Sequence, residues 1–251
     1  MQISLLKDIY YNNDYIFLYL KEGDEVFDFY YKEEEKVFIN KSIKRPIKAI
    51  GNIPVEGGYF DLESAYGYGG YYTNTDDKEF LKRAFSNYSM KCHEEKIIAE
   101  FTRFHPFNNF PIHNSEYLDF NIYDRDVVIV DLKQDIFKSY KAKVRNTIKR
   151  ASEHVELKKS ADIDTFIKLY NITMKKNKAT NFYFFDEVLF RNLYLLEQVE
   201  LYELIHEDNI VAMGFFMFGD VVAHYHLSAN SDLSYKLNSN YALLNSLFEI
   251  A

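Results

Sequence analysis

The stretch VELYELIHEDNIVAMGFFMFGDVVAHYHLS, residues 199–228, contains three apolar runs separated by two short polar turns. The runs are rich in β-branched and aromatic residues, which favours strands. The second turn, Gly219-Asp220, suits a two-residue hairpin because glycine accepts a positive φ. We therefore predict three consecutive antiparallel strands, at 199–206, 210–218 and 221–228.

Apolar residues at helical spacing flank these strands on both sides. We predict helices at 138–151, 163–174 and 188–196, a short strand at 155–158, and a final helix from Ser239. From residue 153 the order is strand, helix, helix, three strands, helix, which resembles the opening of the GNAT N-acyltransferase fold. The last helix runs to Ala251 without a stop signal. We expect a second domain that is incomplete at its C-terminus.

The first half of the chain has a different character, because seven of the nine glycines lie in its first 70 residues. We predict strands at 15–20, 37–40, 97–104, 117–122 and 126–131, a helix at 77–90 and a loop at 105–116. A boundary near 121–125 then divides the chain into two domains, 1–124 and 125–251.

Composition excludes several classes of protein. The chain has 251 residues, and 38 acidic against 30 basic side chains give a formal charge of −8, which argues against a DNA-coating protein. A hydrophobic fraction of 47% excludes a disordered chain, and the single cysteine, Cys92, excludes an internal disulfide. No apolar stretch approaches the roughly 20 residues of a membrane span, and no signal-peptide pattern is visible. We expect a cytoplasmic protein with no integral membrane segment and no DNA partner.

The segment Tyr66-Gly67-Tyr68-Gly69-Gly70-Tyr71 is the most distinctive local pattern. Closely spaced glycines allow a tight turn with positive φ, or they let backbone N–H groups approach an oxygen-rich ligand. The spacing alone leaves both interpretations open. A dinucleotide site is not expected, because the pattern is not G-x-G-x-x-G and no predicted helix follows it directly.

Four segments resemble, in the same order, the Fem-type peptidoglycan bridge-forming aminoacyltransferases and their GNAT-like relatives. They are FDLESAYGYGGYY (60–72), IIAEFTRFHPFN (97–108), KAKVRNTIKRASEHVEL (141–157) and AHYHLSANSDLSYKLNSNYALLNSLFEIA (223–251). Ala65 replaces the proline that is usual in the family. The resemblance implies an α/β protein (α+β by some schemes) of tandem GNAT-like domains, with mixed and mainly antiparallel sheets. The first domain would bind substrate, and the second would carry out acyl transfer.

Members of this family join an activated acyl group, usually an aminoacyl group from charged tRNA, to a primary amine on a cell-wall precursor. Relatives that are acetyltransferases would use acyl-CoA instead. The resemblance therefore implies an N-acyltransferase without a bound cofactor, with a small-molecule or nucleotide-linked amine acceptor and charged tRNA as a further partner. Two alternatives stay open: an acetyl-CoA-dependent N-acetyltransferase acting on an amino sugar or small amine, and a non-catalytic GNAT-fold binding protein.

The loop after the third strand bears on the choice of donor. Acyl-CoA enzymes of the GNAT type usually hold pyrophosphate on glycine-rich backbone at a helix N-terminus. Here the corresponding residues, 229–238, are ANSDLSYKLN and contain no glycine. This favours aminoacyl-tRNA over acyl-CoA as the donor.

Six basic residues and no acid occupy positions 138–150. Such a helix is either a solvated face or a phosphate contact. Arg145 and Lys149 lie one helical turn apart, so both could hold one diphosphate of a nucleotide-linked precursor, tRNA or CoA. We predict these two as phosphate-binding residues.

Position within the matched segments predicts the substrate-binding residues. They are Tyr66, Gly67, Tyr68, Gly69, Gly70, Arg103 and His105 in the first domain, and His226, Ser228 and Tyr235 near the acyl-transfer site in the second. For Arg103 the alternative is a structural side chain tied to backbone carbonyls. No metal is expected. His224 and His226 share a face of the predicted strand, but two histidines without a nearby carboxylate are a weak metal site. The catalytic base stays unknown, since an activated acyl group and a neutral amine need mainly to be held in register.

Overall fold

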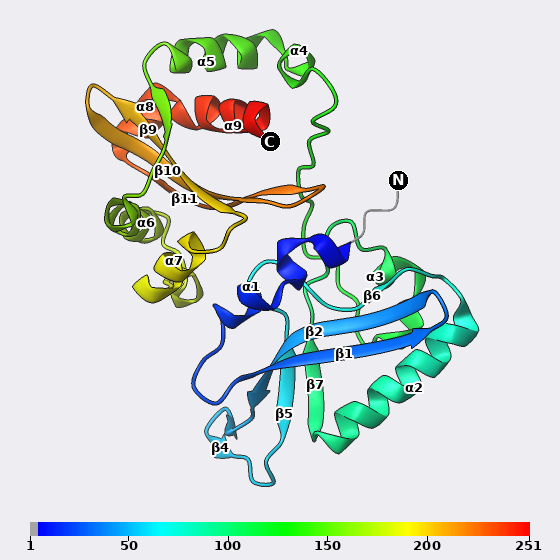
Figure 1. The fold of residues 1–251 in the computed structure, drawn as a ribbon. Helices are drawn as coiled ribbons and strands as arrows, with labels where there is room; N and C mark the ends of the chain where they lie inside the picture. The colour runs from blue at the N-terminus through cyan, green and yellow to red at the C-terminus, as the bar shows by residue number, and fades with distance from the viewer. Residues whose placement is uncertain (1–4) are drawn as a thin grey trace. The chain divides into compact units, whose positions relative to one another are not determined.

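A computed structural model describes residues 5–251 (Figure 1). The chain divides into two compact units, one ending at Val127 and the other beginning at Val128. Each unit combines helices with a mainly antiparallel sheet, which confirms the predicted fold class. None of the helices in the described range has the length and apolar character that a membrane crossing requires.

The first unit is a sheet covered by one long helix. Its strands run in the order β1-β2-β5-β7, with β6 also paired to β2, and only β5 and β7 are parallel. A separate two-stranded ribbon joins β3 and β4. The elements are η1 (Leu5–Lys7), η2 (Ile9–Tyr11), α1 (Asn13–Phe17), β1 (Glu25–Glu33), β2 (Lys36–Pro46), β3 (Ala49–Ile50), β4 (Ile53–Pro54), β5 (Phe60–Glu63), β6 (Tyr72–Thr73), α2 (Lys78–Glu94), β7 (Ile97–Phe101), α3 (Phe110–His113) and η3 (Ser115–Tyr117).

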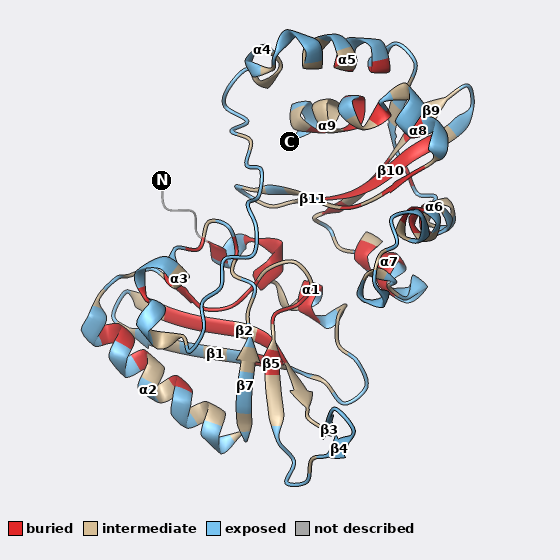
Figure 2. Ribbon diagram, turned by 180° about the vertical axis from the view of Figure 1, so that it is seen from behind, coloured by how far each residue is buried: buried red, intermediate tan, exposed pale blue. Residues whose placement is uncertain are grey.

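Aromatic rings fill the space between α2 and this sheet. Helix α2 buries Phe80 and Tyr88, and the sheet contributes the fully buried Phe38. Tyr88 packs edge-on against Phe38 and against Tyr71, with ring centroids 6.1 and 5.4 Å apart. Burying one such side chain contributes roughly 2 kcal/mol. Figure 2 shows buried residues along β2 and on the inner side of α2.

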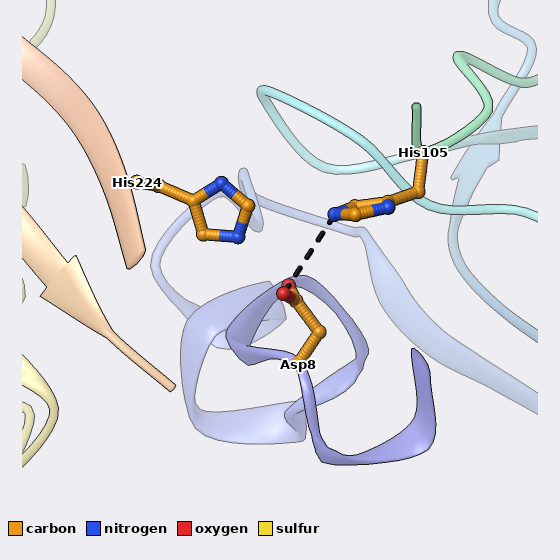
Figure 3. Close-up of side chains that lie close together, drawn as sticks. All are labelled: Asp8, His105 and His224. Atoms are coloured by element: carbon orange, nitrogen blue, oxygen red, sulfur yellow. Dashed lines mark ion pairs between the residues drawn. The ribbon is translucent and has the colours of Figure 1, made fainter. Parts of the chain in front are cut away.

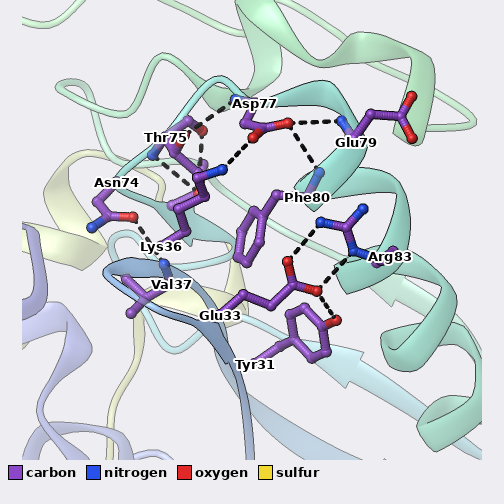
Figure 4. A network of polar contacts seen from close by, with 11 residues as sticks. Tyr31, Glu33, Lys36, Val37, Asn74, Thr75, Asp77, Glu79, Phe80 and Arg83 are labelled. Carbon is purple, nitrogen blue, oxygen red and sulfur yellow. Dashed lines mark hydrogen bonds and ion pairs between the residues drawn. The ribbon is translucent and has the colours of Figure 1, made fainter.

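Polar contacts fix the N-terminal half of α2 to the β1–β2 hairpin (Figure 4). Asp77 caps the helix by accepting from the backbone N–H groups of its first turn, and it also pairs with Lys36. Arg83 donates two hydrogen bonds to Glu33, of 2.8 and 2.6 Å, and Tyr31 donates a third to the same carboxylate. The hydrogen bonds from Arg83, followed by that from Tyr31, lower the pKa of Glu33 from 4.5 to about 2.

The second unit is a four-stranded antiparallel sheet in the order β11-β10-β9-β8, with helices on both faces (Figure 1). Helices α6 and α7 contact one face, and α9 contacts the other face and also packs against α5. The elements are α4 (Ile136–Ser139), α5 (Ala142–Ser152), β8 (Glu156–Lys159), α6 (Ile163–Lys176), η4 (Asn181–Tyr183), α7 (Glu187–Tyr194), β9 (Val199–His206), β10 (Asn209–Phe218), β11 (Ala223–Asn230), α8 (Asp232–Leu237) and α9 (Ser239–Ile250).

Strand β10 lies inside the sheet, and helices cover both of its faces. On one face Phe215 packs edge-on against Phe166 of α6, with ring centroids 4.6 Å apart. On the other face Phe216 joins a core cluster with Leu243 and Leu247 of α9. The near-continuous apolar run at 210–218 therefore belongs to an internal strand.

Three predicted strands are wrong. Residues 15–20 begin inside α1, because the Asn12 side chain accepts from Asp14 N–H and caps a helix there. Segments 117–122 and 126–131 form no strand in the described structure. Phe120 and Val128 are 87% and 93% exposed, so these apolar residues have no sheet to pack on. A β-propensity pattern forms a strand only where a partner supplies the ladder hydrogen bonds.

Four smaller predictions also change. The helix predicted at 138–151 is interrupted at Tyr140, whose carbonyl accepts from the Arg145 guanidinium. The turn predicted at 219–220 is longer, because Gly219 N–H donates to the carbonyl of Val222 and β11 begins only at Ala223. Short helices also occupy part of the predicted loops, namely α3 within 105–116 and α8 within 229–238.

The Glu33 contacts generate a pH prediction. A carboxyl group whose pKa is lower in the folded than in the unfolded state stabilises the fold above the unfolded pKa, and this contribution is lost as pH falls through the folded value. The stabilisation from Glu33 should therefore be complete above pH 4.5 and disappear towards pH 2. In urea titrations the free-energy difference between wild type and Glu33→Gln should shrink across this window.

The exposed Glu22 offers a matched control, and Glu22→Gln should not show that pH dependence. A wild-type advantage over Glu33→Gln that stays constant down to pH 2 would contradict the ion-pair assignment.

Candidate functional site

The glycine-rich segment 66–71 is a tight turn in the first unit. Gly67 and Gly70 have φ of 103° and 89°, in the left-handed region that L side chains rarely adopt. A Cβ on Gly67 would overlap the ring of Tyr10, and one on Gly70 would overlap the Thr102 side chain. Both glycines are therefore needed for the turn itself.

The backbone of this turn is bonded to two segments that are distant in sequence. The Tyr15 hydroxyl donates to the Tyr66 carbonyl at 2.6 Å, and the Tyr11 hydroxyl donates to the Gly69 carbonyl at 3.2 Å. Gly69 N–H donates to the Arg103 carbonyl at 2.9 Å. The turn is thus held between the N-terminal residues and the segment after β7. Because the Gly69 N–H donates to a carbonyl of the same unit, it is not available to bind a ligand.

His105 is buried next to the glycine-rich turn and pairs with Asp8 (Figure 3). Its Nδ1 accepts from Phe107 N–H at 3.2 Å, and its Nε2 lies 3.7 Å from Asp8 Oδ2. Asp8 and His105 are only 6% and 2% exposed. Asp8 also accepts from Tyr10 N–H at 3.1 Å and so caps η2. The carboxylate and the imidazole form one buried polar pair.

The Tyr68 side chain packs against this pair and is also partly exposed to solvent. Its ring packs edge-on against His105 and Tyr10, with centroids 5.4 and 5.2 Å away. Burial raises the pKa of Tyr68, and the positive charges of Arg103 and Arg125 oppose that rise. Arg103 is itself exposed. The structure therefore brings Tyr68, Arg103 and His105 together at the glycine-rich turn, with Arg103 outside and His105 inside.

Tyr66 faces another tyrosine in the same unit. Its ring stacks on Tyr19 at a centroid distance of 6.0 Å and an interplanar angle of 27°. The hydroxyl of Tyr15, whose proton is donated to the Tyr66 carbonyl, also lies within hydrogen-bond distance of the Tyr19 hydroxyl, at 3.1 Å. A cluster of tyrosines therefore supports the turn from the N-terminal side.

In the second unit, His226 lies at a β-bulge. Phe215 of β10 is opposite Leu227, and Phe216 is opposite Tyr225, so His226 is one extra residue on β11. Bulges re-aim side chains and are frequent beside active sites. Removal from water, and secondarily the nearby His224, lowers the pKa of His226 well below 6.5. Its ring is therefore neutral at pH 7.

Ser228 and Tyr235 follow this bulge along the chain. Ser228 is opposite Gly214 in the β10–β11 ladder. Tyr235 of α8 is 49% exposed, and Lys176 Nζ lies 4.1 Å above its ring centroid. Lys176 also pairs with Asp232 at 2.5 Å, so one ammonium joins the C-terminal end of α6 to α8. This contact orients the Tyr235 ring.

A buried polar network fixes the end of β11, and the sequence patterns did not reveal it. The Thr173 hydroxyl donates to the Asn230 carbonyl at 3.2 Å, and Asn230 N–H donates to the same hydroxyl oxygen at 3.0 Å. The Ser234 hydroxyl bonds the Asn230 side chain at 3.1 Å and the Ser239 hydroxyl at 2.6 Å. All four residues are buried. The network therefore sets where α8 and α9 start.

The side chains of Arg145 and Lys149, the two residues predicted to hold phosphate, contact different parts of the second unit. Arg145 donates to the carbonyls of Tyr140 and Lys138, which ties α5 to the end of α4. Lys149 instead lines a hollow between α4, α5 and α9. The two side chains are on one helix, and Arg145 is not among the residues lining that hollow.

Gly70 provides a prediction for the turn. Gly70→Ala should lower the free energy of unfolding by about 2–4 kcal/mol, because it adds an overlap with Thr102 to the strain of a positive φ. Gly51→Ala is the matched control, since Gly51 also has positive φ but nothing lies within 4 Å of its Cβ position. It should cost about 1 kcal/mol. Equal losses for the two variants in urea unfolding would show that close packing at Gly70 is not the constraint.

Comparison with known proteins gives a fold match and no sequence match. No family model matches the chain, and no curated protein matches it. The solved structure of FemX superposes with a TM-score of 0.70 at 11% identity, over 98% of this chain and 80% of that one.

A second solved structure is the C-terminal domain of a protein described as a lysylphosphatidylglycerol synthetase from Agrobacterium fabrum. It reaches a TM-score of 0.49 at 13% identity, over 88% of this chain and 66% of that one. At that score it supports no statement about this chain. The likeness to FemX confirms the Fem-like fold that the sequence segments predicted.

Proposed function

We propose that this chain is an N-acyltransferase that transfers an activated acyl or aminoacyl group to a primary amine. The observation that carries the proposal is the FemX-like fold over 98% of the chain. The four sequence segments that resemble Fem-type enzymes support it, because two of them contain the glycine-rich turn and the His226 bulge. The acceptor we propose is a cell-wall precursor in the cytoplasm.

The reaction needs few functional groups of its own. The neutral amine attacks the acyl carbonyl, the new C–N bond forms, and the bond to the tRNA hydroxyl or CoA thiol breaks. The amine loses a proton and the leaving oxygen or sulfur gains one, so the step is balanced. Positioning alone can contribute on the order of 7–11 kcal/mol to such a step. Hydrogen-bond donors directed at the developing oxyanion lower the barrier further.

In the first unit we assign acceptor binding to Tyr68 and Arg103. The exposed guanidinium of Arg103 suits an anionic group such as phosphate or carboxylate. His105 is too buried to be a main contact, and we infer that it and Asp8 hold the Tyr68 ring in place. Gly67, Gly69 and Gly70 then serve the acceptor indirectly, since they shape the turn that presents Tyr68.

In the second unit we assign the acyl-transfer region to His226, Ser228 and Tyr235. His226 is neutral at pH 7, so it can donate or accept a hydrogen bond without adding charge. Its depressed pKa also makes it a weak proton acceptor, and we do not assign it as the catalytic base. Tyr235 is exposed and oriented by Lys176, which suits contact with the acyl donor.

For the donor we favour aminoacyl-tRNA over acyl-CoA. The residues after β11, 231–238, form a short helix capped by Ser231 and contain no glycine for a pyrophosphate-binding loop. We retain phosphate contact as the proposed role of Lys149, whose side chain is exposed on the basic helix α5. Arg145 contributes mainly by ordering the α4–α5 junction, because its Nη1 donates to backbone carbonyls there.

The decisive assay incubates the full chain with isotope-labelled aminoacyl-tRNA or acetyl-CoA and a nucleotide-linked muropeptide or a small amine. We expect amide product from aminoacyl-tRNA and the muropeptide. Product from acetyl-CoA with an amino sugar or small amine would favour an N-acetyltransferase. Retained ligand binding with no product from either donor would identify a non-catalytic binding protein and reject the proposal.

Arg103 provides a prediction about the acceptor. Arg103→Gln should raise the KM for an anionic acceptor by roughly tenfold and change kcat much less, because one charge-assisted contact is lost. Lys82→Gln is the matched control, since Lys82 is an exposed cation on α2 away from the turn. An unchanged KM in Arg103→Gln would show that the guanidinium does not contact the acceptor.

A further inference from the structure

A hollow in the second unit lies between α4, α5 and α9 and has a volume of about 450 Å³. Helices α5 and α9 run side by side in both ribbon views (Figures 1 and 2). The volume falls in the range of small-molecule sites. The lining residues are Phe137, Ile148, Lys149, Ser152, Glu153, Asn245 and Glu249. All of them belong to the second unit.

Three charged side chains line this hollow, and within residues 5–251 none of them takes part in an ion pair. Lys149 and Glu153 have the i, i+4 spacing that permits a helical ion pair, but Lys precedes Glu, which is the less favourable order. Lys149 Nζ instead lies 6.0 Å from the ring centroid of Phe137. Glu249 accepts a hydrogen bond of 3.0 Å from the Asn245 side chain. One cation and two anions are therefore open to a ligand.

The hollow also contains apolar surface. Ile148 is only 4% exposed, and the half-buried Phe137 also lines the hollow. A purely anionic ligand would be repelled by the two carboxylates, and a purely apolar one would leave the three charges without partners while removing water from them. A ligand with both charges and an aliphatic body satisfies all of these groups.

We propose that this hollow binds a small zwitterion of the amino-acid class. Its ammonium group pairs with Glu153 and Glu249, its anionic group pairs with Lys149, and its aliphatic body lies on Ile148 and Phe137. The site shares Lys149 with the phosphate contact proposed above, but it rests on the lining of the hollow. Its test measures binding alone and does not depend on acyl transfer.

The test titrates 6-aminohexanoate into the isotope-labelled full chain and follows the backbone amide signals of α5 and α9. We expect saturable binding with a Kd on the order of 1 mM, which is ordinary for a ligand of this size. Hexylamine, hexanoate and hexanol each lack part of the zwitterion and should bind at least about tenfold more weakly.

Charge variants test the individual contacts. Glu153→Gln with Glu249→Gln, and separately Lys149→Met, should each weaken binding of 6-aminohexanoate by roughly tenfold. Glu197→Gln and Lys143→Met are matched controls, because both residues are exposed and lie outside the hollow, and they should bind as wild type does. Thermal unfolding of every variant checks that it is folded.

Three results would overturn the proposal. The first is a titration with no saturable shift in α5 or α9. The second is hexanol or hexylamine binding as tightly as the zwitterion, which would show that the paired charges are not recognised. The third is folded charge variants that bind 6-aminohexanoate with wild-type affinity.

Discussion

Two tyrosine hydroxyls from the N-terminal residues hold the glycine-rich turn of the first unit. Tyr15 and Tyr11 donate to the carbonyls of Tyr66 and Gly69, and the turn passes so close to Tyr10 that Gly67 has no room for a side chain. Burial raises the pKa of Tyr11 and Tyr15, so both phenols stay protonated and remain donors at neutral pH. The position of Tyr68, and hence of the proposed acceptor contact, depends on this arrangement.

The second unit places the residues proposed for acyl transfer by a different means. Aromatic side chains pack on both faces of the internal strand β10, and His226 and Ser228 lie on the edge strand β11. The bulge at His226 interrupts the regular pairing of β11 with β10, and the hydroxyl network around Asn230 bonds the end of β11 to Thr173 of α6 and Ser234 of α8. A β-bulge in a well-packed sheet is a common way to position side chains for chemistry.

The sequence predicts the second unit better than the first, and the reason is physical. The runs at 199–206 and 210–218 pair with their sequence neighbours, so local propensity and tertiary structure agree. Residues 15–20 have a similar composition but form part of a helix and turn, because their partners lie about fifty residues away at the glycine-rich turn. Segment 126–131 has strand composition and no strand partner at all within the described range.

In the candidate site, too, features set by local sequence could be predicted, and features that depend on distant residues could not. The glycine-rich turn and the likeness to Fem-type proteins could be read from residues 60–72, and the FemX match confirms that fold. Asp8 could not be predicted, because its pairing with His105 joins positions that only the folded unit brings together. Whether each unit is a GNAT-like domain, and whether the predicted residues bind substrate, stay predictions. The opposed surroundings of Arg145 and Lys149 could not be foreseen either, since helical spacing does not fix where long side chains point.

Hydrogen exchange at the Gly69 amide tests most directly whether the N-terminal tyrosines hold the turn. This N–H donates to the Arg103 carbonyl, and it should be protected in the wild-type chain. In the double variant Tyr11→Phe with Tyr15→Phe, two turn carbonyls lose their donors, at about 1–2 kcal/mol each. The Gly69 amide should then exchange at least about tenfold faster while amides in β10 are unchanged. Equal protection of Gly69 in the variant and the wild type would contradict it.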